Sequence, residues 1–391
     1  MTIYVLTISI STFLLYFETK LKDNPFLRNV LILFAILLPA IIAGGRANTI
    51  GTDIKSYAEP LQRFANLNSN FTDFINFQGI LNNGQPFQRF EKGYVTLIYL
   101  SSRVTPKLWF NFFVTELIIL VCVVLGMIKF SRIRNISLCI GIFIFFTFFY
   151  NMSFNLIRQS LAMFILFYGF SYLVKKEWIK YIITIFVASL FHSSAIIGCL
   201  FMFVYWLLYR NTKTQLYFKL NNDHVLSKQA LLSLFLSLMV VIALFSPAII
   251  KEILSSFNLS KYVSYLPSSI KGSWIELITR LPFFAILLVE WRNNSKNKLR
   301  YFYLVMTVLD ICLSQLSGND SAATVFGSRI SWYTSVFYIY SMSDMLEAKK
   351  DTKTLVSKIL LILYLCIYWY VFTVVLNYNE TVPYIFNGFQ Y

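Results

Sequence analysis

Long apolar stretches separated by short basic segments constrain this chain more than any other feature. The stretches are roughly 15–22 residues long and recur from one end of the sequence to the other, and a membrane-spanning helix needs about 20 such residues. Charged residues make up 13% of the sequence, about half the share usual in soluble domains. No interval between the stretches is long enough for a separate soluble domain. The sequence therefore predicts an all-α fold, a polytopic integral membrane helical bundle that forms a single domain over residues 1–391.

The basic residues predict how this bundle is oriented, because short cytoplasmic loops collect Lys and Arg. Most of the 34 basic residues fall near residues 20–28, 129–134, 175–180, 210–228, 292–300 and 349–358. Placing these segments in the cytoplasm predicts both termini outside and about 12 transmembrane helices. They are expected near residues 2–17, 29–44, 109–128, 136–150, 158–174, 178–192, 195–209, 229–246, 276–291, 300–317, 329–345 and 355–376. The first is expected to be a retained helix, because it lacks the basic start of a signal peptide.

Two long segments between the predicted helices lie on the outer side in this topology. Residues 45–108 form the first, a long outer-face loop in which Gly93–Val104 is too short to span a bilayer and predicts an interfacial or re-entrant helix. Residues 247–275 form the second outer-face loop, whose Tyr, Trp and Lys content favours an interfacial helix. The net charge of +16 follows from this topology. Because the basic residues are distributed between spans, no nucleic-acid partner is expected.

Residues 155–195 predict a membrane hairpin with its chemistry on one side. Arg158 and His192 lie at its two ends, and Lys175 and Lys176 form the corner between the helices. Each arm covers about 25 Å at 1.5 Å per helical residue, so Arg158 and His192 return to the same depth. Ionisable groups in a membrane are costly and usually serve a site, so this pair predicts one at the outer face.

Arginine is favoured over lysine at the outer ends of the predicted helices. The guanidinium group can hold phosphate or carboxylate with two parallel hydrogen bonds, which lysine cannot do. For any single arginine the alternative is that it reaches the lipid headgroups. For several that converge, an anionic ligand is the better interpretation. The residues concerned are Arg46, Arg63, Arg89, Arg103, Arg158, Arg280 and Arg329.

Few side chains could accept a proton at this face. His192 is the first candidate for a general base, since an unperturbed histidine pKa near 6.5 suits neutral pH. The alternative is a histidine that caps a helix or binds a neighbouring one. Asp53, Glu91 and Asp320 are rival bases or sugar-binding carboxylates, whereas Asp310 and Glu116 are expected to form structural ion pairs with arginines. No cluster has metal-ligand spacing, so no metal or other cofactor is predicted.

Four short motifs, in this order, resemble a known family. They are GTDIKSY with Asp53 and Tyr57, FEKGY with Glu91 and Tyr94, NLIRQSLA with Arg158, and ASLFHSSA with His192. Together they are similar to the EpsG-type branch of bacterial polysaccharide polymerases, which includes O-antigen and capsule polymerases of the Wzy kind. The resemblance is concentrated in residues 44–200, and Arg329 is the one later correspondence.

The resemblance implies a membrane glycosyltransferase that joins oligosaccharide repeat units carried on undecaprenyl diphosphate. The product would be O-antigen for lipopolysaccharide, capsule or exopolysaccharide, made at the periplasmic or external face of the bacterial inner membrane. The implied partners are the lipid-linked donor and acceptor, membrane lipid and a chain-length regulator protein. An O-antigen ligase and a lipid-linked oligosaccharide flippase remain the alternatives. The expected catalytic residues are His192, Arg158, Asp53 and Glu91; the diphosphate-binding residues Arg158, Arg329, Arg280 and Arg46; and the sugar-binding residues Tyr57, Tyr94 and Asp320.

Overall fold

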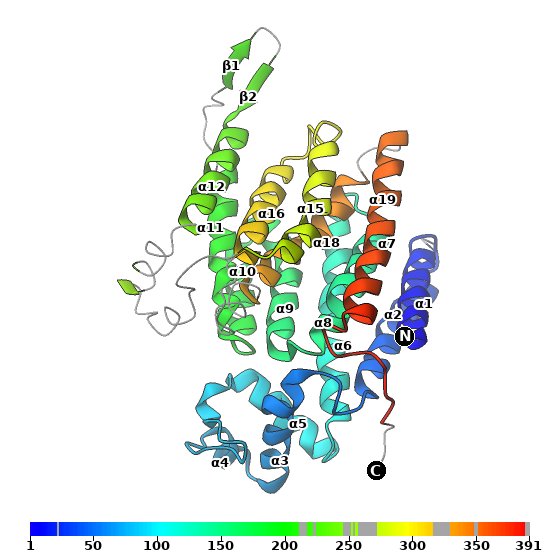
Figure 1. The fold of residues 1–391 in the computed structure, drawn as a ribbon, viewed down its shortest axis with the longest axis vertical. Coiled ribbons are helices and arrows are strands. Elements are labelled where there is room, and N and C mark those ends of the chain that lie inside the picture. The colour runs from blue at the N-terminus through cyan, green and yellow to red at the C-terminus, as the bar shows by residue number, and fades with distance from the viewer. Residues whose placement is uncertain are drawn as a thin grey trace. The chain divides into compact units, whose positions relative to one another are not determined.

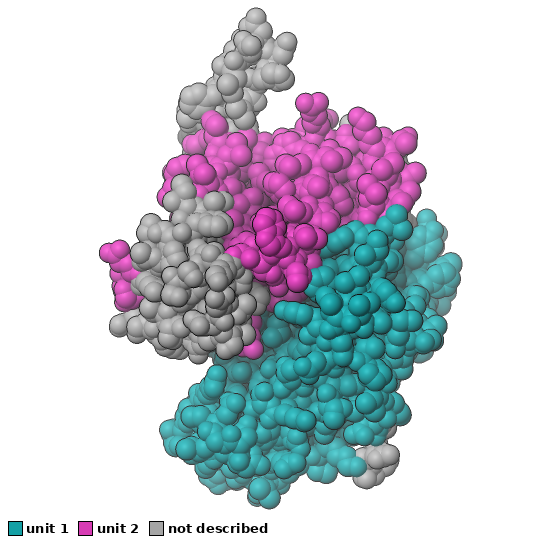
Figure 2. All heavy atoms as spheres, in the orientation of Figure 1, with its two compact units in different colours: residues 1–198, 362–391 teal, residues 199–361 magenta. Residues whose placement is uncertain are grey.

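The computed structural model describes residues 1–21, 23–210, 217–221, 224–244, 252, 255–256, 272–315, 329–347 and 351–387. The chain divides into two compact units (Figure 2). Unit 1 is Met1–Gly198 with Ile362–Tyr391, and unit 2 is Cys199–Leu361. The single integral membrane domain expected for the whole chain stays a prediction.

Unit 1 consists of helices and short helical turns (Figure 1). Its α-helices are α1 (Thr2–Glu18), α2 (Pro25–Gly44), α3 (Glu59–Leu67), α4 (Phe71–Ile75), α5 (Lys92–Val104), α6 (Trp109–Ser131), α7 (Leu138–Ile144), α8 (Asn151–Ser153), α9 (Ile157–Val174) and α10 (Trp178–Ser189). π-Helical turns lie at Ile54–Ala58, Phe145–Tyr150 and Tyr370–Val375, and 3₁₀ turns at Phe87–Arg89 and Ser193–Ile197.

Unit 2 is also helical in its described part, with one small hairpin. Strands β1 (Tyr217–Asn221) and β2 (His224–Ser227) pair antiparallel. The helices are α11 (Gly198–Tyr209), which begins at the boundary between the units, α12 (Lys228–Leu244), α15 (Trp274–Val289), α16 (Arg300–Ser314), α18 (Phe337–Met345) and α19 (Thr352–Trp369), which ends in unit 1. The predicted interfacial helix in residues 247–275 falls almost entirely outside the described residues, and so does Asp320.

The apolar helices make this a multi-pass membrane protein. Four in the described part of the chain are long and apolar enough to cross a bilayer: Pro25–Gly44, Trp109–Ser131, Ile157–Val174 and Thr352–Val375. Shorter apolar helices lie at Thr2–Glu18, Leu138–Ser153, Trp178–Ser189, Ser193–Tyr209 and Lys228–Met239. Every segment in which a crossing is expected contains helix, but only these four reach full spanning length and hydropathy among the described residues. The count of about twelve crossings stays a prediction.

The hairpin expected from Arg158 to His192 is present as α9 and α10. α9 packs against both α6 and α10, and most of its side chains are buried, as expected of a helix that is apolar on all sides. Lys175 ends α9, and Lys176 turns the chain with a positive φ of 60°. A Cβ on Gly169 would lie 2.5 Å from Thr184 Cγ2, so this glycine permits the close approach of the two helices.

Residues 45–108 form an ordered layer rather than a simple connector. α5 packs against α3, α4 and α6, and Figure 1 shows α3, α4 and α5 gathered beyond one end of α6. A cluster of aromatic rings fills the space between these short helices, with centroids 4.5–5.7 Å apart among Phe64, Phe74, Phe77, Phe87 and Tyr99. The helix expected at Gly93–Val104 is α5. Its interfacial position stays a prediction.

The segment after α19 closes back onto the first residues of this layer. The Ala47 amide donates to the Ile385 carbonyl at 2.9 Å, and the Asn387 amide donates to Gly45 at 3.0 Å. Tyr4 reaches the same segment by donating its hydroxyl to the Thr381 carbonyl at 2.9 Å. The segment after α19 is therefore bonded both to residues 45–47 and to α1.

Unit 2 buries an ion pair between two of its helices. The Arg280 Nε atom of α15 lies 3.2 Å from the Asp310 Oδ2 atom of α16, and the side chains are 1% and 0% exposed. Asp310 also accepts hydrogen bonds from Tyr338 at 2.6 Å and Ser335 at 2.7 Å, while Arg280 forms a second ion pair with Glu276. This confirms the ion pair expected between Asp310 and an arginine.

Candidate functional site

The start of α9 is held by the loop that carries the GTDIKSY motif. The Asn155 Oδ1 atom accepts from the Thr52 amide at 2.8 Å, and the Asp53 Oδ2 atom accepts from the Ile157 amide at 3.3 Å. A carboxylate at this position satisfies an amide that the helix itself leaves unpaired, and it complements the helix dipole. Gly51 makes the approach possible, since it has a φ of +113° and a Cβ there would lie 2.5 Å from the Phe154 carbonyl oxygen. The loop therefore fixes the first turn of α9 in which Arg158 lies.

Arg158 is held between aromatic rings and a carboxylate. Its Nη1 atom lies 2.5 Å from the Glu91 Oε2 atom, and the two side chains are 15% and 16% exposed. Its guanidinium carbon lies 4.5 Å from the Tyr57 ring centroid and 5.1 Å from that of Phe90. Within the described residues, Arg158 Nε has no hydrogen-bond partner. The guanidinium group of Arg158 is thus fixed in place, and one of its N–H donors remains without an acceptor within the described residues.

Glu91 joins the two arms of the hairpin at the end opposite the lysine corner. Its Oε1 atom accepts from the Ser193 amide at 2.9 Å, and its Oε2 atom pairs with Arg158. Two residues later, the Gly93 amide donates to the Leu190 carbonyl at 2.8 Å. A Cβ added to Gly93 would lie 2.5 Å from that carbonyl oxygen. The FEKGY motif thus combines a bridging carboxylate with a glycine that lets α5 touch the end of α10.

His192 caps the short helical turn that follows α10. Its Nδ1 atom accepts from the Ser194 amide at 3.3 Å and lies 2.5 Å from the Ser194 hydroxyl. A neutral imidazole has one donor and one acceptor nitrogen, so this contact assigns the proton of neutral His192 to Nε2. The ring is half-buried. The helix-capping role considered for this histidine is therefore present in the structure.

Electrostatics favour the charged form of Glu91. Burial raises the pKa of its carboxyl, but the positive charges of Arg158 and protonated His192 lower it, as does the hydrogen bond from the Ser193 amide. The net result is a pKa below the ordinary value. Burial, followed by the charge of Asp53, raises the pKa of the Tyr57 hydroxyl well above its ordinary value. Tyr57 therefore stays neutral, and its hydroxyl donates a short hydrogen bond to the Asp53 carboxylate.

The two tyrosines expected to bind sugar are both inside the protein. Tyr57 is 4% exposed and Tyr94 is fully buried, with ring centroids 5.7 Å apart. Tyr94 donates to the Asn111 Oδ1 atom at 3.3 Å. Both rings are packed inside the protein, where Tyr57 contacts the Arg158 guanidinium, so neither ring has a face exposed to a ligand.

The four arginines expected to bind diphosphate are divided equally between the two units. Arg158 and Arg46 lie in unit 1, and Arg280 and Arg329 in unit 2. Arg280 is occupied by the buried ion pairs already described, whereas Arg329 is exposed. Arg46 is 4% exposed and lies between Phe112 and Phe154, with its guanidinium carbon 4.1 and 4.2 Å from their ring centroids.

Three further residues of the four motifs, to which no role was assigned from the sequence, complete the site. Asn155 receives the Thr52 amide, Phe90 covers Arg158, and the Ser193 amide bonds to Glu91. Ser193 directly follows the helix predicted at residues 178–192, and Asn155 lies three residues before the helix predicted at 158–174. A polar residue close to a helix terminus was therefore the available signal. In the described part of the chain, no group of three His, Cys, Asp or Glu residues is arranged to hold a metal ion.

Comparison with known proteins identifies one family. A sequence model of the EpsG family matches residues 29–386. The match includes every site residue described above and extends well beyond residues 44–200. No curated protein and no solved structure matches the chain.

Proposed function

The chain belongs to the EpsG family, which is associated with exopolysaccharide biosynthesis, and we propose that it is the glycosyltransferase that polymerises lipid-linked repeat units. In this proposal the growing chain leaves its undecaprenyl diphosphate carrier and joins the newest repeat unit at the outer face of the inner membrane. The observation that carries the proposal is the Glu91 carboxylate, which joins Arg158 to the Ser193 amide beside His192.

The charge that develops in this reaction suits Arg158. An acceptor sugar hydroxyl forms a bond to the donor's anomeric carbon while the bond from that carbon to the diphosphate oxygen breaks, and the electron pair leaves with the diphosphate. A preorganised cation in a site of low water content stabilises that developing charge, a contribution of several kcal/mol in enzymes of known mechanism. Arg158 is preorganised by Tyr57, Phe90 and Glu91. We assign it to the leaving diphosphate, and Glu91 to positioning it.

Besides acting as a general base, His192 could act as a hydrogen-bond donor to the leaving group. Because its Nδ1 atom accepts from Ser194, neutral His192 carries a donor on Nε2. That donor can hydrogen-bond an oxygen of the leaving diphosphate. If His192 takes this role, the proton of the acceptor hydroxyl passes to Asp53 or Glu91; if it does not, His192 is a third candidate for the base. Separate Asp53→Asn, Glu91→Gln and His192→Gln variants identify the acceptor by which of them removes the ascending limb of the pH–rate profile.

The glycan profile of cells tests the polymerase reaction. In a strain that lacks the protein and expresses Arg158→Ala, we expect the variant to insert normally and surface glycan to fall to single-repeat length. Arg89→Ala is the matched control, since Arg89 lies two residues before Glu91 and is exposed. Normal chain length on the carrier with failed transfer to the final acceptor would instead indicate a ligase. Accumulation of repeat units on the inner leaflet would indicate a flippase.

A further inference from the structure

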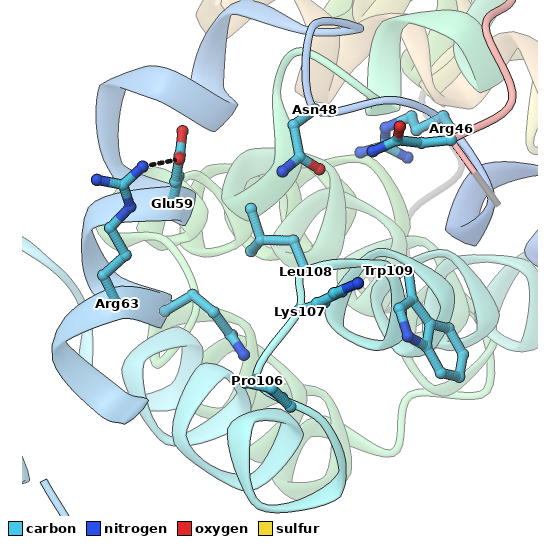
Figure 3. Close-up of a pocket in the computed structure, with 10 residues that line it drawn as sticks. Arg46, Asn48, Glu59, Arg63, Pro106, Lys107, Leu108 and Trp109 are labelled. Carbon is cyan, nitrogen blue, oxygen red and sulfur yellow. Dashed lines mark hydrogen bonds and ion pairs between the residues drawn. The ribbon is translucent and has the colours of Figure 1, made fainter. Parts of the chain in front are cut away.

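A second cationic pocket lies in unit 1, at the edge of the layer formed by residues 45–108 (Figure 3). Its volume is about 290 Å³, several times the ~30 Å³ that one water molecule occupies in the liquid. The cavity is therefore large enough for a ring-sized ligand. Its walls come from α3, from the turn between α5 and α6, from the residues after α2 and from Asn387 of the closing C-terminal segment.

Three cationic side chains line this pocket against one carboxylate. They are Arg46, Arg63 and Lys107, and the carboxylate is Glu59. Glu59 and Arg63 pair at 2.5 Å on one face of α3, as Figure 3 shows. Arg46 and Lys107 lie apart from that pair in the same view. The pocket thus carries a net positive charge and favours an anion.

Two buried side chains of the lining have polar atoms without a partner. Arg46 is 4% exposed, and its Nε atom has no hydrogen-bond partner in the described part of the chain. Gln62 is 2% exposed, and its Oε1 atom likewise has none among the residues described. Buried polar groups are normally satisfied, so Arg46 and Gln62 are the lining residues that retain unused hydrogen-bonding capacity.

The mixture of lining groups selects the class of ligand. A fully ionised phosphate has no hydrogen-bond donor for the acceptor oxygens of the lining, and the Glu59 carboxylate would repel it. A saccharide can use these acceptors, because its hydroxyls donate hydrogen bonds to a carboxylate or to the amide oxygens of Asn48, Gln62 and Asn387. The indole of Trp109 adds an apolar surface of the kind that sugar rings contact.

We propose that this pocket binds an acidic sugar residue, a saccharide that bears a carboxylate or a phosphate group. Arg46 and Lys107 take the oxyanion, and Glu59 with the amides takes the hydroxyls. The Phe154 ring centroid lies 4.2 Å from the Arg46 guanidinium carbon, and Phe154 stands four positions before Arg158 in the chain, so the pocket and the start of α9 share a contact. Insofar as that sugar belongs to the repeat unit, the inference rests on the proposed function.

Binding to the purified full chain in neutral phosphatidylcholine nanodiscs tests the proposal. Methyl glucuronide is expected to bind saturably, and methyl glucoside at least about tenfold more weakly, because it lacks the charged acceptor. Lys107→Gln should weaken glucuronide binding by about tenfold. Arg63→Gln should weaken it less, because it acts only by leaving the charge of Glu59 uncompensated. Lys55→Gln is the matched control, since Lys55 is an exposed lysine outside the pocket, and it should change nothing. Both main variants alter exposed residues, which avoids the folding defect expected when buried Arg46 is replaced.

Three results would overturn the proposal. The first is equal binding of glucoside and glucuronide, or equal binding by Lys107→Gln and Lys55→Gln. The second is inorganic phosphate binding as tightly as glucose 1-phosphate, which would mean that the sugar adds nothing. The third is phosphatidylglycerol in the nanodisc competing with glucuronide in the unaltered protein but not in Lys107→Gln, which would identify a lipid-headgroup site. Normal glycan length in cells that express Arg158→Ala, together with intact glucuronide binding by that variant, would count against the role proposed for Arg158 and would not affect the pocket proposal.

Discussion

The Glu91 carboxylate accepts a hydrogen bond from the Ser193 amide at 2.9 Å, although 102 positions separate the two residues. The same carboxylate holds Arg158, so one side chain joins the layer of residues 45–108 to both arms of the α9–α10 hairpin. Changes at Glu91 should therefore alter the geometry of the hairpin ends and the position of the cation together.

Arg158→Lys should remove most of the polymerising activity even though it keeps the charge. Lysine cannot reproduce the planar fork that lies against Tyr57 while it pairs with Glu91. We expect a rate roughly 10²-fold lower or more, the loss usual when one group that stabilises transition-state charge is removed. The measurement is elongation of a purified lipid-linked repeat unit in nanodiscs. Normal elongation by Arg158→Lys would show that a point charge is sufficient.

Glu91→Gln should destabilise the protein at neutral pH and much less in acid. The folded-state pKa of Glu91 is lowered, so its charge stabilises the fold above the unfolded pKa of about 4.3 and ceases to do so as pH falls through the lower folded value. We expect a loss of about 1–3 kcal/mol near pH 7, since charged hydrogen bonds are broken.

Thermal unfolding of the two proteins from pH 3 to pH 8 measures this difference. The gap in unfolding temperature should be constant above about pH 5 and should narrow below about pH 4. A gap that widens in acid would mean that Glu91 is neutral in the folded protein.

Gly51→Ala should detach the GTDIKSY loop from the start of α9. The added Cβ would lie 2.5 Å from the Phe154 carbonyl oxygen, and the φ of +113° is itself strained for alanine. We expect a loss of roughly 2 kcal/mol or more, seen as faster proteolysis of residues 45–108.

Gly84→Ala isolates the cause of that effect. Gly84 also has a positive φ, of +81°, but no atom lies within 4 Å of the position that a Cβ would take. It should cost about 1 kcal/mol, which reflects backbone strain alone. Equal effects at both glycines would argue against the close contact with Phe154.

Arg280→Gln distinguishes a structural arginine from a diphosphate ligand. Removing one partner of a fully buried ion pair typically costs about 3–5 kcal/mol, so the yield of folded protein should fall sharply. Adding Asp310→Asn removes the stranded charge and should restore much of that yield. If Arg280→Gln folds normally but no longer elongates glycan, Arg280 belongs with the diphosphate-binding residues, as the sequence analysis expects.

The sequence contains enough information for the hairpin but not for its cross-links. The apolar periodicity and the Lys175–Lys176 corner locate α9 and α10 within a few residues, because both signals are local. The choice of Glu91 rather than Asp53 as the partner of Arg158 is not local. It depends on α5 touching the end of α10 through Gly93, a contact that no spacing in the sequence reveals.

The same limit explains the aromatic and cationic residues of the outer layer. Tyr57 and Tyr94 are of a type that commonly stacks on sugars, but their burial depends on how α3 and α5 pack. Arg46 is close in sequence to the GTDIKSY motif, yet Phe112 of α6 and Phe154 before α9 fix its position. Residue type predicted an anion site at the outer helix ends, and tertiary packing gives Arg46 and Arg158 different neighbours within unit 1.

The pairing of residues 45–47 with residues 385–387 sets the order in which the protein can be assembled during synthesis. The related bond from Tyr384 to the Ile42 carbonyl joins residues 342 positions apart. At the usual ribosomal rate of about 5–20 residues per second, residue 384 follows residue 42 by roughly 17–70 seconds. For that interval α9 and α10 can already lie in the membrane, while the wall that Asn387 contributes to the acidic-sugar pocket does not yet exist. The pocket is therefore completed after the hairpin, and a ribosome stalled before residue 387 would present the hairpin without the complete pocket.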